Sequence, residues 1–235
     1  MNIPMKTINN RILTALFIIL SQNVHAQSFM NLDFESATIV SDPSSPYYPY
    51  AVYTSNAIPG WAVTGNFLGP DEIFYNDLSL GSPSVALLGT GGPIAPLDGA
   101  FSIDLYGGAG PSTAVSISQM GLVPSNAASI RFVAQPPNPL LGGPLLVSLG
   151  GQNISFSPIS TGSNYTLYGG NIPSILAGQI EQLTFSTPTD GGNNYWEIDD
   201  IQFSSSSVPE PNIFGLLALG GLFFGWTRSR NSARY

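Results

Sequence analysis

The sequence contains no cysteine, one histidine and one lysine among its 235 residues. Disulfide bonds and thiolate metal sites are therefore excluded. His25 and Lys6 both lie in the first 26 residues, so removal of that segment would leave a chain with neither residue type. Such a chain lacks the imidazole of Ser-His-Asp and Cys-His nucleophiles and of histidine metal sites, and the amine of Schiff-base enzymes.

Charged residues are also scarce, at 9% of the chain, and the two signs are separated. Thirteen of the 14 acids lie between residues 27 and 207, where Arg131 is the only base, so this segment has a net charge of −12. The other five bases lie in the first eleven or the last eight positions. A body this acidic repels phosphate backbones, which excludes nucleic acid as a partner.

The first 26 residues have the three parts of a secretory signal peptide. Lys6 and Arg11 form a positive start, residues 12–20 are an apolar run, and small residues precede a cleavage point between Ala26 and Gln27. As a helix the apolar run would extend about 14 Å, too short to cross a bilayer of about 30 Å. The pattern predicts a signal helix that directs export and is removed by signal peptidase; the alternative is a first helix of the core.

The last 28 residues combine a Pro-Glu-Pro sequence, an apolar segment and most of the arginines. Residues 213–226 are uncharged and would extend about 21 Å as a helix, a length that by itself favours a buried helix or a processing signal. Three features favour membrane contact instead: Pro209 and Pro211 block a helix upstream, Trp226 suits an interface, and the terminal arginines would stay cytoplasmic. These arginines are Arg228, Arg230 and Arg234. We therefore predict a C-terminal hydrophobic helix that anchors the exported protein transiently in the inner membrane.

The order Val208-Pro209-Glu210-Pro211, hydrophobic segment and arginine-rich end resembles the PEP-CTERM sorting signal of exopolysaccharide-producing Gram-negative bacteria. The resemblance covers residues 208–235. It implies that an exosortase recognises and cleaves the tail in the membrane and releases the protein to the cell surface or extracellular matrix. It leaves the activity of the exported part open.

Residues 27–203 have the length of one domain, and the serines at 204–207 are expected to link it to the tail. Glycine (26 residues) and proline (20 residues) separate short runs in which apolar and polar residues alternate. This pattern is typical of half-buried strands and predicts an all-β fold, an antiparallel two-sheet sandwich. The predicted strands are Phe29–Glu35, Ser84–Leu88, Ala100–Tyr106, Ala114–Met120, Ser129–Ala134, Leu145–Leu149, Asn153–Phe156, Tyr165–Tyr168, Gln179–Ser186 and Tyr195–Phe203.

Several short segments resemble the jelly-roll domains of the galactose-binding-like group, which includes many carbohydrate-binding modules. They are Asn31-Leu32-Asp33-Phe34-Glu35, Ile58-Pro59-Gly60-Trp61, Ala177-Gly178-Gln179 and Trp196-Glu197-Ile198-Asp199-Asp200-Ile201. The resemblance implies that the first and last strands lie near one another and close the sandwich.

The carboxylates of those segments are candidate ligands for a metal ion. Alternation along a strand puts Glu197 and Asp199 on one face, and places Asp33 and Glu35 together likewise. Calcium prefers oxygen ligands, and the resembled domains often hold a structural calcium in this region. The alternative is a solvated strand end whose carboxylates bind turn amides. A glycoside hydrolase is a more distant alternative, since paired carboxylates suffice for that chemistry.

Aromatic residues offer the best case for ligand binding. Tyr47, Tyr48 and Tyr50 lie in a proline-stiffened loop, and Trp61 follows a turn signal. Flat rings with a polar rim hold sugar rings by stacking. The alternative is that these rings cover one end of the sandwich.

The sequence thus predicts an exported, non-enzymatic protein of the cell surface or extracellular matrix, associated with exopolysaccharide. A carbohydrate-binding module proper, with an aromatic sugar-stacking site, is the alternative.

Overall fold

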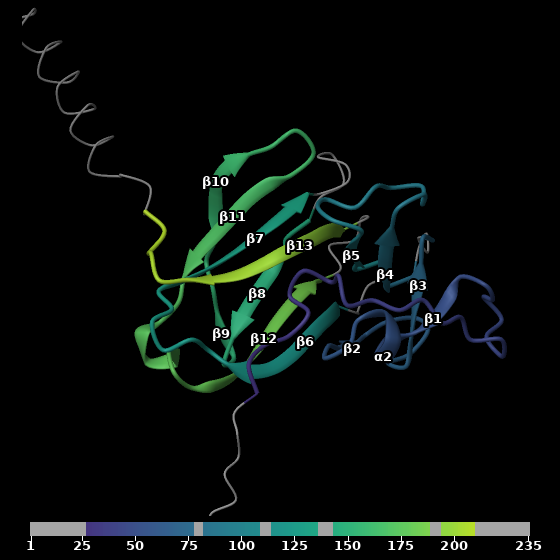
Figure 1. The fold of residues 1–235 in the computed structure, drawn as a ribbon, viewed down its shortest axis with the longest axis horizontal. Helices are drawn as coiled ribbons and strands as arrows, with labels where there is room; N and C mark the ends of the chain where they lie inside the picture. Colours follow the sequence, from purple (N-terminus) through teal and green to yellow (C-terminus); the bar gives the residue numbers. More distant parts are fainter. Residues whose placement is uncertain (1–26, 78–81, 109–113, 136–142, 189–193, 210–235) are drawn as a thin grey trace, which may run out of the picture.

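The computed structural model describes residues 27–77, 82–108, 114–135, 143–188 and 194–209. These residues form two β-sheets, one of eight strands and one of five (Figure 1). Helical structure in the described ranges is limited to α2 (Thr54–Ala57) and the short 3-10 helix η1 (Ser174–Leu176). No helix in these ranges is long and apolar enough to span a membrane. The predicted signal helix and C-terminal hydrophobic helix lie outside the described residues.

The larger sheet has the strand order β1-β3-β4-β5-β13-β7-β11-β10. All of its strand pairs are antiparallel except β3 with β4. Its strands are β1 (Ala51–Tyr53), β3 (Glu72–Tyr75), β4 (Ser84–Gly89), β5 (Phe101–Tyr106), β7 (Ser129–Gln135), β10 (Ser157–Thr161), β11 (Thr166–Asn171) and β13 (Tyr195–Ser204).

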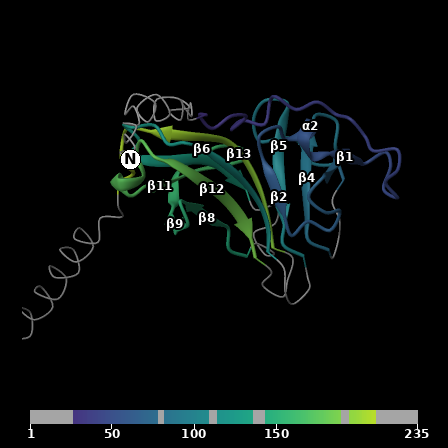
Figure 2. The same ribbon diagram turned by 90° about the horizontal axis from the view of Figure 1, so that it is seen from below.

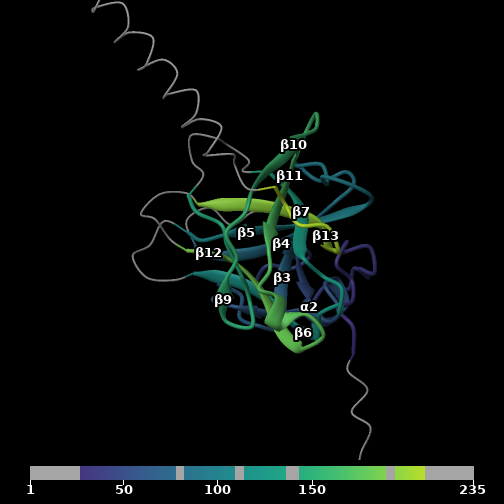
Figure 3. The ribbon, with the colours of Figure 1, turned by 90° about the vertical axis from the view of Figure 1, so that its left-hand side faces the viewer.

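The smaller sheet has the order β2-β6-β12-β8-β9 and is antiparallel throughout. In the end-on view of Figure 3, β10 and β11 of the larger sheet lie at the top, while β6 and β9 lie at the bottom. Its strands are β2 (Ala62–Thr64), β6 (Val115–Leu122), β8 (Leu146–Leu149), β9 (Gln152–Asn153) and β12 (Ile180–Thr187).

The main hydrophobic core draws on both sheets. Along β6, Val115 and Ile117 are fully buried while the intervening serines are half-buried, as the alternating sequence predicts. Phe132 of β7 meets Phe185 of β12 edge to face, with ring centroids 5.2 Å apart, and so joins the two sheets. The prediction of a mostly β, two-sheet structure is confirmed.

The predicted strand at 29–35 is absent, the predicted strand Asn153–Phe156 overlaps a strand only at Asn153, and four short strands were not predicted. Residues 29–35 form turns, because Asn31 and Phe34 adopt positive φ angles of 51° and 56° that interrupt an extended backbone. The additional strands are β1, β2, β3 and β10. Three of them have only three or four residues, and β10 carries Pro158 at a sheet edge next to a register shift.

The serine segment after the last strand is attached to the fold. Ser204 ends β13, and the Ser129 hydroxyl donates to the Ser206 carbonyl at 2.7 Å. The Ser206 amide donates to Ser204 Oγ at 3.1 Å. The expected linker is therefore partly ordered, because these serines bind one another and β7.

Candidate functional site

The predicted tyrosine loop is exposed at one end of the larger sheet. It precedes the edge strand β1 and projects beyond it at the right of Figures 1 and 2. Tyr47, Tyr48 and Tyr50 are 39%, 59% and 52% exposed, so each has ring surface available to a ligand. Phe67, which the sequence analysis missed, is 49% exposed and contacts Tyr47 edge to face at 5.6 Å.

A polar network holds this loop in place. Asp42 Oδ1 accepts hydrogen bonds from the Ser44 amide at 2.8 Å and the Ser44 hydroxyl at 2.7 Å, and these bonds lower the pKa of Asp42 to about 2. The Ser45 hydroxyl donates to Glu72 Oε2 at 2.9 Å. Desolvation by burial and the neighbouring Asp42 raise the pKa of Glu72. The hydrogen bond from Ser45 to Glu72 thus attaches the base of the loop to β3.

Trp61 occupies a different environment from the tyrosines. It is 5% exposed, its Nε1 donates to the Asn31 carbonyl at 3.0 Å, and its ring packs on Phe34 with centroids 5.7 Å apart. Trp61 therefore packs in the core, and its indole nitrogen has a hydrogen-bond partner. Stacking of a sugar on Trp61 would require the core to open.

Two of the predicted calcium ligands bind the same turn. Glu35 Oε1 accepts hydrogen bonds from the Ala100 and Phe101 amides at 2.7 and 3.0 Å. Asp199 Oδ2 accepts one from the Asp98 amide at 3.2 Å. Asp33 only caps its own turn, where Oδ1 accepts from the Glu35 amide at 3.3 Å. Three of the four carboxylates thus bind turn amides, as the alternative interpretation expects, but Glu197 binds a serine hydroxyl and, like Asp199, is buried and not solvated.

Three buried acids share the outer face of the larger sheet. Glu197 and Asp199 alternate with the core residue Ile198 on β13, and Asp104 of β5 pairs directly with Glu197. The Ser102 hydroxyl donates to Glu197 Oε1. Both carboxyl oxygens of Asp104 are buried without a hydrogen-bond partner.

Burial raises the pKa of all three groups. Desolvation raises the pKa of Glu197 to about 7 and that of Asp199 to about 8. Desolvation, together with the charge of Glu197, raises the pKa of Asp104 well above its ordinary value. The three acids hold protons more tightly than free carboxyls, because charging them inside the protein is unfavourable.

The described residues contain no group of three or more histidine, cysteine or acidic side chains arranged to hold a metal ion. A structural calcium stays a prediction of the sequence. The carboxyls of the distant glycosidase alternative, Glu197 and Asp199, are 4% and 1% exposed, so a sugar cannot reach them in this conformation.

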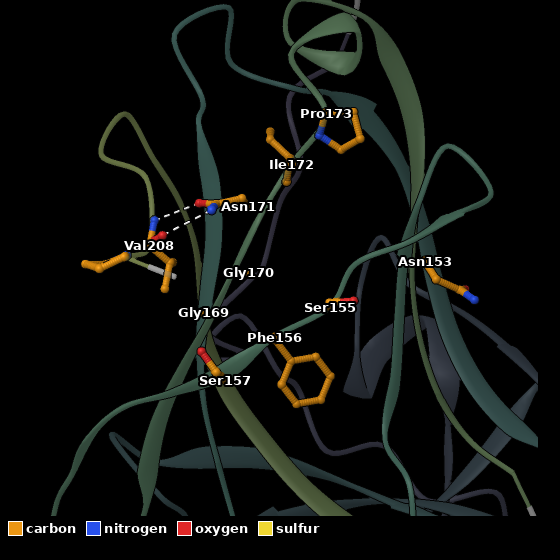
Figure 4. A pocket seen from close by; sticks show the side chains of 11 residues that line it. Asn153, Ser155, Phe156, Ser157, Gly169, Gly170, Asn171, Ile172, Pro173 and Val208 are labelled. Atoms are coloured by element: carbon orange, nitrogen blue, oxygen red, sulfur yellow. Dashed lines mark hydrogen bonds between the residues drawn. The ribbon is translucent and has the colours of Figure 1, made fainter. Parts of the chain in front are cut away.

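The first residue of the proposed sorting motif is held against the larger sheet (Figure 4). The Val208 amide donates to Asn171 Oδ1 at 2.7 Å, and Asn171 Nδ2 donates to the Val208 carbonyl at 3.0 Å. Val208 is buried beside a pocket of about 650 Å³. Phe156, Ile172, Pro173 and Pro209 also line this pocket.

The other predicted site residues lie mainly outside the described ranges. Gln27, just after the predicted cleavage point, is exposed, and its carbonyl accepts a hydrogen bond from the Leu122 amide at 2.9 Å. The residues outside are Ala26, Glu210, Pro211, Arg228, Arg230 and Arg234.

No protein-family model and no curated protein sequence matches the chain. Among solved structures, the secreted serine protease VesC from Vibrio cholerae matches 56% of this chain at 11% identity, with a TM-score of 0.31. The match spans 26% of the protease chain.

Proposed function

We propose that this chain is an exported, non-enzymatic protein of the cell surface or extracellular matrix that contacts exopolysaccharide. In this proposal signal peptidase removes residues 1–26. Exosortase then processes the tail at 208–235 after a transient stay in the inner membrane. The body between them is a jelly-roll sandwich of the kind found in carbohydrate-binding modules.

The observation that supports polysaccharide contact is the aromatic loop. Tyr47, Tyr48 and Tyr50 expose ring surface, and Asp42 and Glu72 anchor the segment that carries them. Pre-ordered aromatic surface lowers the entropic cost of binding, and sugar C–H faces stack on such rings. The tyrosine hydroxyls can exchange hydrogen bonds with sugar hydroxyls.

Replacing Tyr48 by alanine should weaken retention of the mature protein on its host exopolysaccharide by about tenfold. The lost stacking is worth about 1.4 kcal/mol, which is a factor of ten in affinity. Affinity electrophoresis in polysaccharide-containing gels measures this change. Tyr48→Phe, which keeps the ring, is the matched control and should bind as the wild type does. Equal retention of the alanine variant and the wild type would remove the loop from the binding surface.

The sorting part of the proposal predicts the two ends of the mature protein. Mass spectrometry of protein recovered from the host matrix should find an N-terminus at Gln27 and no peptide containing the terminal arginines. These losses are expected because each end carries a processing signal. Recovery of a matrix protein that still includes Arg234 would contradict processing of the tail.

A further inference from the structure

The outward face of the smaller sheet carries two rows of mostly polar, uncharged side chains that run across its strands. In the first row, direct cross-strand partners run from β2 to β9. They are Ala62, Ser118, Thr184, Ser148 and Asn153. Hydroxyl and amide groups thus form a line across β6, β12, β8 and β9, with Ala62 of β2 at its end.

A second row runs parallel to the first, two residues further along each strand. Thr64 pairs with Ser116, Ser116 with Ser186, and Ser186 with Leu146. On the other side of the first row, Met120 pairs with Gln182, whose Nε2 donates to Ser118 Oγ at 3.3 Å. Apolar side chains therefore flank the hydroxyl rows, and Met120 and Leu146 are 57% and 45% exposed.

These rows face away from the core. The residues that alternate with them, such as Ile117, Leu183 and Val147, are buried between the sheets. Successive side chains of a strand point to opposite faces, so the rows lie on the outer face. Met120, Gln182 and Asn153 are exposed there.

Charge is absent from this face although the body is strongly acidic. The strands of the smaller sheet contain one charged residue, Glu181. Glu181 alternates with Gln182 and shares the inward side of β12 with Leu183 and Phe185. On the described strands, an occupant of the outer face therefore meets hydroxyls, amides and apolar groups and no charged side chain.

We propose that this face, the hydroxyl face, binds a neutral polysaccharide chain laid across the strands. Neighbouring strands are about 4.8 Å apart, so the four polar residues of the first row extend over about 14 Å, enough for a few sugar units. Serine and threonine hydroxyls donate and accept hydrogen bonds, as sugar hydroxyls do. The flanking Met120 and Leu146 offer apolar surface to sugar C–H groups. An acidic polymer would be repelled by the net charge of the body.

A second copy of the chain fits this face less well. Stable protein interfaces have an apolar centre, and here the centre consists of hydroxyls that would need partners once buried. Two bodies of like charge would also repel one another. The inference rests on the proposed polysaccharide contact and assigns it to a surface remote in sequence from the tyrosine loop.

The test compares retention of the mature protein on amorphous cellulose and curdlan, which are neutral, and on calcium alginate beads, which are acidic. Thr184→Glu puts a charge at the centre of the first row and should reduce retention on a neutral probe at least tenfold. Thr184→Val removes only the hydroxyl and should reduce it several-fold. Ser160→Glu makes the same charge change on β10 of the other sheet and should have no effect. Thermal melts check that each variant is folded.

Each outcome decides the matter. Retention unaffected by Thr184→Glu, or preferential retention on alginate, overturns the hydroxyl face. Loss only in Tyr48→Ala also overturns it while leaving the proposed function in place. Failure of the wild type to bind any of these probes overturns both. Light scattering that shows a dimer dissociated by Thr184→Glu would assign the face to a second copy instead.

Discussion

Unfolding measurements should show the protein losing several kcal/mol of stability between pH 5 and pH 8. Burial raises the pKa of Glu197 to about 7 and that of Asp199 to about 8. In the unfolded chain both groups release their protons near pH 4, so between pH 4 and 8 the native state binds more protons. Their contribution to the free energy of unfolding is therefore fully present at low pH, and it is lost as pH rises through the folded pKa values. The shift of Glu197 alone corresponds to about 3 kcal/mol.

Neighbouring acidic residues strengthen this pH dependence, because their charges raise the pKa values of the buried acids further. Asp98 and Asp200 lie close enough to raise the pKa of Asp199, and Glu197 raises that of Asp104. Asp42 behaves oppositely: its lowered pKa means that its contribution is lost only as pH falls toward about 2. Between pH 5 and pH 8 Asp42 therefore does not contribute to the change, whereas Glu72, whose pKa is also raised by desolvation, acts in the same direction as the buried acids.

Amide variants provide the control. Glu197→Gln can still accept the Ser102 hydrogen bond, and Asp199→Asn can still accept from the Asp98 amide, yet neither side chain ionises. Urea titrations at both pH values should show a smaller loss in each variant than in the wild type. An identical loss in the variants would mean that these two carboxyls are not protonated in the native state.

Trp61→Ala should cost about 3 to 5 kcal/mol of stability. The side chain is 5% exposed and packs against Phe34, so its removal leaves a large cavity and an unpaired Asn31 carbonyl. Chemical denaturation at pH 5, where the protein is most stable, measures this change.

Trp61→Phe separates packing from hydrogen bonding. It keeps most of the ring but loses the Nε1 donor, so the expected cost is lower, about 1 to 2 kcal/mol. Polysaccharide retention of this variant should match that of the wild type, because Trp61 contributes to the core. A folded Trp61→Phe variant with reduced retention and unchanged stability would return Trp61 to the binding surface.

The strands that could be predicted are those whose alternation is long enough to be distinctive. Along β6 and β12 seven or eight residues alternate, and each strand appears within two residues of its predicted bounds. β1 and β2 have three residues each, too few for a period of two to show. Residues 29–35 alternate like a strand, but the left-handed backbone at Phe34 turns the chain and brings its ring onto Trp61.

The placement of candidate site residues could be predicted where only local features mattered. Proline and tyrosine in one short segment indicated an exposed loop, and Tyr48 and Tyr50 are exposed. Alternation correctly placed Glu197 and Asp199 on one face of a strand, but it could not show that both are buried. Their burial depends on the loop before β5. Leu97 of that loop is buried, and the Asp98 amide binds Asp199.

The bond pair between Asn171 and Val208 has a consequence for export. It fixes the start of the C-terminal tail to β11, so residue 209 departs from a defined point of the folded body. If the tail is the sorting signal that we propose, the first residue of its motif, Val208, is held by the folded body when the processing enzyme meets it. In an unfolded chain Asn171 would not hold Val208, so the point from which the tail departs is defined only once the body has folded.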